Sequence, residues 1–501
     1  MTATRTRITR RGLLGGLAAA LAAPQVMAAP PARSLRPRPR PPMLGQVTAP
    51  DGAELVARAR LDARIGYSVA DAASGTMLEG RDSRVPLPPA SVAKALTTLY
   101  ALDRLGADHR FATRLVATGP VQDGVIKGDL VLAGSGDPTL DTDGLAQLAA
   151  DLKAAGIRSV EGAFRTWAGA LPYVDTIDVE QPAHVGYSPA VSGLNLNFNR
   201  VHFEWRREGS NYAVTMDART GRFRPDVATA RMAIVDRSGP VYTYADRGGI
   251  DDWTVARGAL GKGGARWLPV RRPDAYAAEV FATLARSHGI VLKPAEPARA
   301  APSGTTLAEW RSGPLTGMLR DMLLHSTNIT AECLGMAASR AGDPQIDSLV
   351  GSAAAMNAWL STRYGVEGVA LVDHSGLGGA SRVTTEAMVR VLADPRSRAA
   401  LRPLLKGFLL RDSQGRPDRG SPIDVVAKTG TLNFVSGLAG YAKAADGTDL
   451  VFAIFAADVP RREALSEAQR ERPPGARGWN GRAKMLQSAL IERWGTLYGT
   501  S

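Results

Sequence analysis

Cysteine is almost absent from the 501 residues: Cys333 stands alone, so no disulfide can form within the chain. It lies in the apolar stretch Ile329–Met336, where a thiol is more often a small buried hydrophobe than a nucleophile. Histidine is also scarce, with six residues and no H-E-x-x-H pattern. We therefore predict no metal site and no cofactor. A chain of this length has room for two or three domains, whose cores need no disulfides.

Acidic residues are missing from the first 42 positions, which carry eight arginines. The formal net charge of the chain is +13, so residues 43–501 account for only +5 of it. The excess of positive charge is thus a feature of the terminus, and no basic stripe with interleaved aromatic residues runs through the rest of the chain. We predict no nucleic-acid partner.

A long hydrophobic run is missing as well. The first apolar run, Gly12–Ala23, has about a dozen residues, against the ~20 that a membrane-spanning helix needs. Arginines precede this run, and the small residues Ala28 and Ala29 follow it, which is the pattern of a cleaved export signal. We expect residues 1–28 to be that signal. The mature protein is then periplasmic or otherwise extracytoplasmic, with no transmembrane anchor.

Arginine pairs and prolines give the terminus two further features. Arg10 and Arg11 precede Gly12-Leu13-Leu14, which resembles a twin-arginine signal, while export by an ordinary secretory signal stays open. In residues 29–46, arginine and proline alternate as far as Pro42. Because proline fixes φ and removes a backbone donor, we expect an extended, solvated linker there.

The pattern of apolar residues changes twice after this linker. Residues 65–79 predict a hairpin, and helical spacing begins at Val92. Residues 112–300 predict a β-rich inserted region, because short strand-like runs alternate there with Gly, Asp and Asn turns. We expect a mixed α/β, multidomain fold in which residues 47–111 and 301–501 form one domain around the insertion. The strand-like runs of the insertion are Arg114–Ala117, Asp129–Leu132, Val201–Arg206, Tyr212–Met216 and Pro240–Tyr244.

Ser91-Val92-Ala93-Lys94 is an S-x-x-K pattern at the start of a predicted helix, directly after Pro88-Pro89. Residues three apart share a helix face, so the amine of Lys94 can reach the hydroxyl of Ser91. A serine hydroxyl becomes a strong nucleophile when a base takes its proton. Lysine can be that base only when it is neutral, which requires burial or a nearby cation to lower its pKa.

Two further short motifs follow in the sequence. Ser326-Thr327-Asn328 is an S-x-N pattern at the end of a helical run; its serine can relay a proton to a leaving amine, and Asn328 can hold a substrate amide. Lys428-Thr429-Gly430-Thr431 follows an apolar run and is predicted to lie on a strand. We expect Lys428, Thr429 and Thr431 to bind a carboxylate. Gly430 would leave room for a substrate backbone, and the N–H groups of Ser91 and Thr431 would form an oxyanion hole.

Scarcity of lysine makes this combination specific. The chain has nine lysines against fifty-two arginines, and it contains one S-x-x-K, one S-x-N and one K-T-G in that order. Each motif alone is weak, but the three are predicted to lie at a helix start, at a helix end and on a strand. Together they are the set used by β-lactamases and penicillin-binding proteins.

These residues resemble the class C low-molecular-mass penicillin-binding proteins, the D-Ala-D-Ala carboxypeptidase/endopeptidase family. The 231 residues between Lys94 and Ser326 are typical of that family, which has a large, mostly β insertion there, whereas β-lactamases have far fewer residues in this gap. Four other segments are similar to its motifs: Gly134–Leu140, Tyr187–Asn199, Asn328–Glu332 and Asp373–Leu377. The resemblance implies a transpeptidase/β-lactamase-like domain, with an antiparallel sheet flanked by helices and a helical lobe.

The resemblance also implies a function. Ser91 would attack the carbonyl between two D-alanines of a peptidoglycan stem peptide, with Lys94 as base. Lys428 would depress the pKa of Lys94 and anchor the terminal carboxylate, and Ser326 would pass the proton to the leaving amine. β-Lactams would acylate Ser91 and act as covalent inhibitors.

His374 departs from the family, which has glycine at this position. We expect it to be a loop residue, because Ser-Lys chemistry leaves no role for an imidazole. Two alternatives to the main hypothesis stay open. One is a related serine hydrolase, such as a β-lactamase, an esterase or a D-aminopeptidase. The other is a catalytically idle scaffold that binds the cell wall.

Overall fold

The computed structural model describes residues 49–499 of the protein, and these residues fall into one compact unit. The expected export signal, residues 1–28, and the expected linker, residues 29–46, lie outside the described residues. Within residues 49–499, no helix is both long and apolar enough to cross a lipid bilayer.

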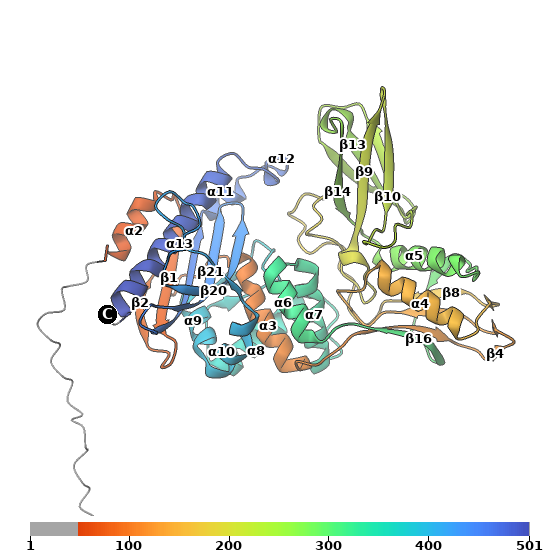
Figure 1. The fold of residues 1–501 in the computed structure, drawn as a ribbon, viewed down its shortest axis with the longest axis horizontal. Coiled ribbons are helices and arrows are strands. Elements are labelled where there is room, and N and C mark those ends of the chain that lie inside the picture. Colours follow the sequence, from red (N-terminus) through yellow and green to blue (C-terminus); the bar gives the residue numbers. More distant parts are fainter. Residues whose placement is uncertain (1–48, 500–501) are drawn as a thin grey trace, which may run out of the picture. The chain divides into compact units, whose positions relative to one another are not determined.

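A six-stranded antiparallel sheet forms the first layer, in the order β19-β20-β21-β22-β1-β2 (Figure 1). β1 pairs along its whole length with β22, for example Tyr67 with Ile454, so the two ends of the described chain meet in one sheet. The predicted hairpin at residues 65–79 and the predicted strand that carries Lys428 are both part of it. The strands are β1 (Arg64–Asp71), β2 (Met77–Arg81), β19 (Lys406–Gly407), β20 (Asp424–Leu432), β21 (Val435–Lys443) and β22 (Asp449–Ala457).

Helices cover both faces of this sheet. Alternate residues of β22 face opposite ways. Phe452 and Ile454 pack with α2 (Gly52–Ala59) and α13 (Ala476–Tyr498), while Ala453 and Phe455 pack with α3 (Ala93–Leu105) and its neighbours. Figure 1 shows α13 lying along the sheet. Burial on both faces explains why the central strands are almost entirely apolar.

The second face carries the helical lobe and several short elements. These are η1 (Ala90–Val92), α3 (Ala93–Leu105), α6 (Leu315–His325), α7 (Asn328–Gly342), α8 (Leu349–Tyr364), β17 (Val369–Ala370), β18 (Arg382–Val383), α9 (Thr385–Ala393), α10 (Pro395–Leu401) and η4 (Arg402–Leu404). The short helices α11 (Val459–Glu463) and α12 (Glu467–Arg470) connect β22 to α13.

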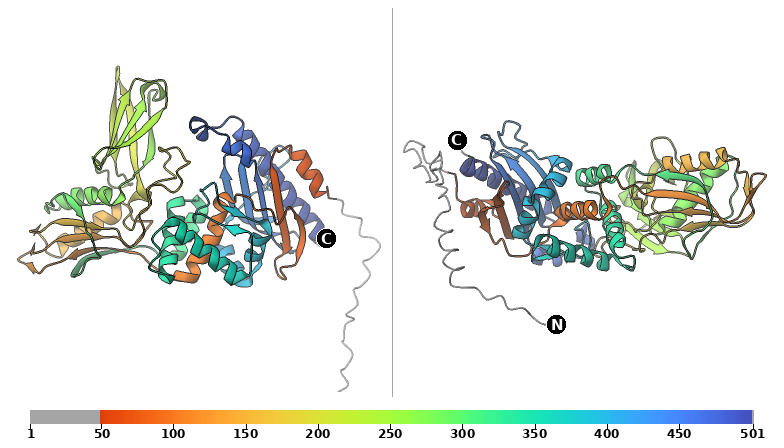
Figure 2. Two further views of the ribbon diagram at one scale, coloured as in Figure 1. Left: turned by 180° about the vertical axis from the view of Figure 1, so that it is seen from behind. Right: turned by 90° about the horizontal axis from the view of Figure 1, so that it is seen from below.

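A second sheet, with five strands in the order β15-β8-β6-β3-β16, has a hydrophobic core of its own. Helices α4 and α5 pack against each other and against this sheet, as seen from behind and from below in Figure 2. Its edge strand β16 follows residue 300 and pairs with β3, so this sheet draws on residues beyond the predicted end of the insertion. The elements are β3 (Ala112–Ala117), β6 (Leu130–Ala133), α4 (Thr142–Ala154), β8 (Phe164–Trp167), α5 (Pro273–Ser287), β15 (Ala295–Pro297) and β16 (Thr305–Arg311).

Three small sheets complete the region predicted to be an insertion, which we call the insertion, with the orders β4-β5-β7, β10-β9-β14 and β11-β13-β12. They contain the predicted strand-like runs after residue 200. Their elements are β4 (Val121–Gln122), β5 (Val125–Ile126), β7 (Ser159–Val160), η2 (Asn197–Asn199), β9 (Arg200–Glu208), β10 (Asn211–Asp217), β11 (Ala230–Val235), β12 (Tyr242–Asp246), β13 (Asp251–Ala256), η3 (Arg257–Ala259) and β14 (Gly263–Pro269).

Candidate active site

Ser91 lies in a turn of 3-10 helix, η1, directly before α3. The prolines before it cannot donate a backbone hydrogen bond, so they end the preceding extended segment and start the helix. Ala90 adopts the left-handed conformation, with φ +46°, although it has a side chain and is 1% exposed. Such backbone strain is frequent at functional sites. The turn is therefore a constrained element that presents Ser91 at the end of a buried helix.

The amine of Lys94 has three hydrogen-bond partners. Its Nζ lies 3.0 Å from Ser91 Oγ, 2.7 Å from Asn328 Oδ1 and 2.9 Å from the carbonyl oxygen of Ser375. The last two oxygens can only accept, so they take two N–H bonds of the amine. Ser91 Oγ can accept or donate. A neutral Lys94 therefore directs its lone pair at the Ser91 hydroxyl.

Burial controls the charge of Lys94, whose side chain is 0% exposed. Loss of hydration lowers the pKa of Lys94 below that of a free lysine, and the nearby carboxylates of Glu332 and Asp373 partly oppose the change. This is the direction required for a lysine base. The sequence-based mechanism requires a lowered pKa for Lys94, and burial of the amine provides it.

A layer of two buried carboxylates lies behind Lys94, and neither residue was predicted to belong to the site. Glu332, on α7, accepts hydrogen bonds from the backbone N–H groups of His374 (2.9 Å) and Ser375 (3.0 Å). Asp373 accepts from the N–H groups of Gly376 (2.7 Å) and Gly378 (2.6 Å). Burial raises the pKa of both carboxyl groups. Together they fix the loop 373–378, and with it the Ser375 carbonyl that holds Lys94.

The S-x-N motif spans the junction between α6 and α7. Ser326 ends α6 in the left-handed conformation, with φ +59°, and Asn328 is the first residue of α7. The amide of Asn328 has both ends occupied: Oδ1 accepts from Lys94, and Nδ2 donates to the carbonyl oxygen of Tyr187 at 2.9 Å. Tyr187 belongs to the insertion, so a backbone group from that region orients a side chain of this cluster.

Lys428, on β20, connects the third motif to the second. Its Nζ donates to Ser326 Oγ at 3.0 Å and to the carbonyl oxygen of Thr429 at 2.8 Å. Burial, together with the charge of Lys94, lowers the pKa of Lys428 to about 6. Burial is the largest cause of the lowered pKa of Lys94. The repulsion between the two lysines contributes to the low pKa of Lys428, and its predicted effect on Lys94 stays a prediction.

Thr429 and Thr431 lie on the other face of β20. They pair with Leu438 and Ser436, whose side chains pack against or bond to groups on the α13 side of the sheet. Among the described residues, β19 pairs with β20 only at Val426 and Ala427. The edge of β20 beyond Ala427 therefore offers free backbone groups. A ligand can contact Lys428, Thr429 and Thr431 at the same time only if it lies along this edge.

Gly430 has a different role from the one predicted. A Cβ at this position would lie 2.6 Å from the Pro89 carbonyl oxygen and 3.0 Å from the Ser91 nitrogen, both of which are backbone atoms. The space beside Gly430 is thus filled by the turn that carries Ser91. The glycine allows β20 to pack directly against that turn.

We predict that Gly430→Ala displaces the Ser91 turn. Overpacking against fixed backbone should cost about 1–3 kcal/mol of stability and should lower the rate of acylation of Ser91 sharply. The measurements are urea unfolding and the rate of adduct formation with penicillin. Gly407→Ala on the neighbouring strand β19 is the matched control, because its added Cβ meets no atom within 4 Å. Equal behaviour of the two variants would contradict this assignment.

His374 lies in a loop, as expected, but is completely buried. Its Nε2 lies 2.7 Å from Ser352 Oγ, and burial lowers the pKa of the imidazole to about 3, so the ring is neutral. The ring occupies the space beside Gly335, where an added Cβ would lie 2.1 Å from it. His374 has an ordinary negative φ, since it is not among the residues with positive φ, so its backbone does not need glycine. It is a packing residue.

Comparison with known proteins identifies this arrangement. Residues 52–472 match the family described as D-Ala-D-Ala carboxypeptidase 3 (S13). The chain belongs to this family. A D-alanyl-D-alanine carboxypeptidase of Actinomadura sp. (strain R39) is 30% identical over 436 residues, which cover 78% of this chain and 77% of that protein. A carboxypeptidase of Mycobacterium tuberculosis is 28% identical over 451 residues, or 84% of this chain and 86% of that protein.

The fold of this S13 chain is also that of a solved structure. Penicillin-binding protein 4 of Haemophilus influenzae superposes with a TM-score of 0.71 at 20% identity, covering 88% of this chain and 99% of that protein. A second structure of the same protein, complexed with a β-lactam, gives a TM-score of 0.69. The predicted mixed α/β, multidomain fold is confirmed, and so is the prediction of a D-Ala-D-Ala carboxypeptidase enzyme.

The predicted site residues of this S13 enzyme form two hydrogen-bonded groups, and the residues that hold these groups in place were not predicted. Lys94 joins Ser91 to Asn328, and Lys428 binds Ser326 in a second group, with no hydrogen bond between the two groups in the described part of the chain. Glu332 and Asp373 were missed as functional positions, although both lie in segments that resembled family motifs. The carbonyl groups of Ser375 and Tyr187 had no sequence signal, because every residue carries a backbone carbonyl.

Proposed function

We propose that the protein is a serine-type D-Ala-D-Ala carboxypeptidase/endopeptidase that cleaves peptidoglycan stem peptides through an acyl-enzyme at Ser91. The observation that carries this assignment is the hydrogen bonding of Lys94. Two acceptors, Asn328 Oδ1 and the Ser375 carbonyl, bind the two N–H groups of the neutral amine. The lone pair of the amine then points to Ser91 Oγ, which lies 3.0 Å from Nζ. Neutral Lys94 takes the hydroxyl proton as Ser91 attacks the carbonyl between two D-alanines.

The leaving amine is protonated from the opposite side of the site. Ser326 donates its hydroxyl proton to the amine, and Lys428, 3.0 Å away, replaces it. The structure pairs Ser326 with Lys428 and not with Lys94, so the proton relay that we propose runs through Lys428. Lys428, together with Thr429 and Thr431 at the free edge of β20, also binds the terminal carboxylate. Binding this anion favours the charged form of Lys428, whose pKa is otherwise low.

An oxyanion hole from the backbone N–H groups of Ser91 and Thr431 fits the close packing at Gly430. A Cβ on Gly430 would contact the Ser91 nitrogen at 3.0 Å, so the two backbone segments run side by side. Water then hydrolyses the acyl-enzyme. A β-lactam has no separate leaving group, so its acyl-enzyme persists. The related protein from Haemophilus influenzae has been solved in complex with a β-lactam.

Intact-mass spectrometry with benzylpenicillin tests the assignment. We expect one added penicilloyl mass per chain, on the tryptic peptide that contains Ser91, and no adduct on Ser91→Ala. D-Alanine release from a pentapeptide should fall to background in the same variant. An adduct that survives Ser91→Ala would refute the nucleophile. Fast turnover of nitrocefin without a stable adduct would indicate a β-lactamase instead.

We also propose that residues 1–28 export the enzyme through a twin-arginine-like signal, that residues 29–46 are a linker, and that the catalytic domain is built from residues 47–111 and the segment after β16. Supporting this, the backbone N–H of Ser312 donates to the Phe111 carbonyl, so the chain leaves and re-enters this domain at adjacent points. N-terminal sequencing of the exported protein should begin at Ala29 or Pro30.

A further inference from the structure

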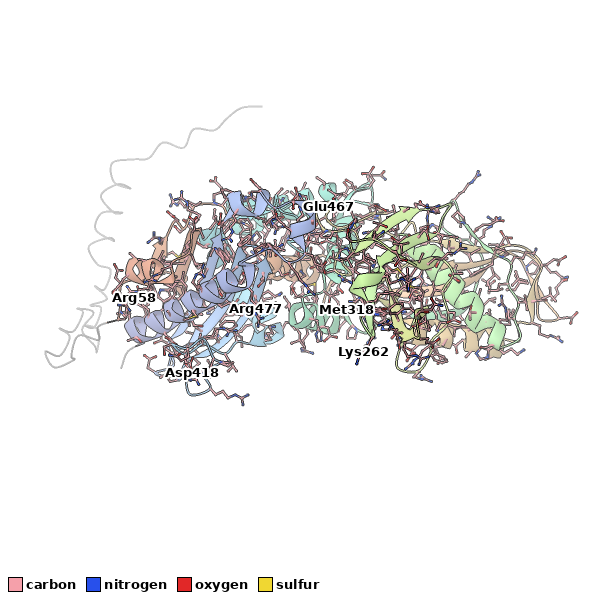
Figure 3. All side chains as sticks on the ribbon, turned by 90° about the horizontal axis from the view of Figure 1, so that it is seen from above. Arg58, Lys262, Met318, Asp418, Glu467 and Arg477 are labelled. Carbon is pink, nitrogen blue, oxygen red and sulfur yellow. The ribbon has the colours of Figure 1, made fainter. Side chains whose placement is uncertain are left out.

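A cavity of about 590 Å³ opens beside the S-x-N motif. Ser326, Thr327 and Asn328 line one side of it, and Met318 (labelled in Figure 3), Asp321 and Met322 of α6 line another. The segment of the insertion around Tyr187, Phe198 and Arg200 closes the third side. We call this space the leaving-side cavity, because Ser326 is the residue assigned above to the leaving amine.

Arg200 gives this cavity an unpaired positive charge. Its guanidinium stacks over the rings of Phe198, at 5.2 Å, and Trp267, at 5.6 Å. Its Nε is buried and has no hydrogen-bond acceptor, and no ion pair within residues 49–499 involves this side chain. Burial also lowers the pKa of Arg200. Buried polar groups are almost always paired, so an unpaired guanidinium in a cavity is typical of a site for an anion.

The rest of the lining suits a peptide. Met318, Asp321, Met322 and His325 are spaced so that they share one face of α6, and all four line the cavity. The methionines and Phe198 supply an apolar wall, while Asp321 is exposed and, in the described part of the chain, pairs with no cation. The cavity thus combines a cation, an anion and an apolar surface.

Size favours one of two leaving groups. The cavity, of about 590 Å³, is a partly open cleft that is much larger than free D-alanine. Free D-alanine has six heavy atoms and would leave most of this volume empty. A leaving amine that belongs to a second stem peptide continues into a chain with further carboxylates and amides, and such a chain fills the space.

We propose that the leaving-side cavity binds the second peptide of a cross-linked substrate, with a carboxylate of that peptide on Arg200. This rests on the proposed function and specifies it, because it assigns endopeptidase activity to a defined subsite. The peptide that keeps the acyl group lies along the edge of β20. The peptide that departs lies between α6 and the segment 186–200, and Arg200 determines the preference for cross-linked over free termini.

The test compares two substrates on Arg200→Gln. With a cross-linked muropeptide dimer we expect kcat/KM to fall about 10- to 100-fold, mostly through KM, as for the loss of a hydrogen bond to a charged group. With a monomeric pentapeptide, D-alanine release should stay within about twofold of wild type, since free D-alanine does not reach Arg200. Activity on the monomer also shows that the variant is folded.

Arg222→Gln is the matched control, because Arg222 also stacks on a phenylalanine in the insertion, at 5.4 Å, but is exposed. It should leave both substrates unaffected. Asp321→Asn should raise KM for the dimer alone, by a smaller factor. An unchanged dimer rate in Arg200→Gln, or an equal loss on both substrates, would overturn the subsite. If wild type releases no D-alanine from the pentapeptide yet cleaves the dimer, the carboxypeptidase part of the proposed function fails while the subsite stands.

Discussion

Lys94→Met should lower the rate at which penicillin acylates Ser91 by about 10²- to 10⁴-fold, the usual contribution of a general base. Methionine has a similar length and no charge, so it fills the space of the buried lysine side chain. It leaves Asn328 Oδ1 and the Ser375 carbonyl without their shared donor, which should cost about 1–3 kcal/mol for each unsatisfied acceptor. Stopped-flow acylation and urea unfolding measure the two effects separately.

The pH dependence of wild type supplies a second readout for Lys94. Below its pKa the amine is protonated and has no lone pair, so the acylation rate should rise about tenfold per pH unit and then level off. Because burial lowers the pKa of Lys94, the midpoint should lie well below the value of about 10.4 for a free lysine. Lys443→Met, at an exposed lysine, is the control. A midpoint above pH 10, or near-normal acylation by Lys94→Met, would exclude Lys94 as the base.

Glu332→Gln should lower the plateau rate of acylation by about 10²-fold, because the Ser375 carbonyl moves and small displacements in an active site have large effects. The new amide nitrogen would face a backbone N–H group, which leaves one buried donor of loop 373–378 unpaired. The stability loss should be about 1–3 kcal/mol. The ascending limb of the pH profile should also shift to lower pH, since the carboxylate of Glu332 raises the pKa of Lys94.

Glu279→Gln separates instability from loss of function. Glu279, on α5, also accepts from two backbone N–H groups, those of Ala228 and Thr229, but it lies in the insertion. We expect some loss of stability and an unchanged acylation rate and pH profile. If Glu332→Gln behaves in the same way, the buried carboxylate layer is structural only.

Local spacing was enough to predict the contact between Ser91 and Lys94. Ser91 and Lys94 are one helical turn apart, so their contact depends on nearby residues alone, and the pairing of β20, β21 and β22 follows from their apolar runs and short turns. The family resemblance then joined Ser326 and Lys428 to them across more than two hundred residues.

Features that depend on tertiary packing were not predictable in this way. Glu332 looks like any polar residue in a helix until loop 373–378 covers it. Gly430 was predicted to leave room for a substrate backbone. Its actual neighbour, the Pro89 carbonyl, could not be predicted, because the two come together only when β20 packs on η1. The pKa of Lys428 depends on burial and on Lys94, and neither can be read from the K-T-G motif.

The hydrogen bond from Asn328 to the Tyr187 carbonyl has a consequence for the role of the insertion. The insertion is more than an accessory module, because its Tyr187 carbonyl accepts a hydrogen bond from Asn328, and Asn328 in turn accepts one from Lys94. A chain without this region would lack the acceptor of Asn328 Nδ2, so water or another group would have to take its place. A change in the insertion therefore alters the hydrogen bonding of the catalytic centre.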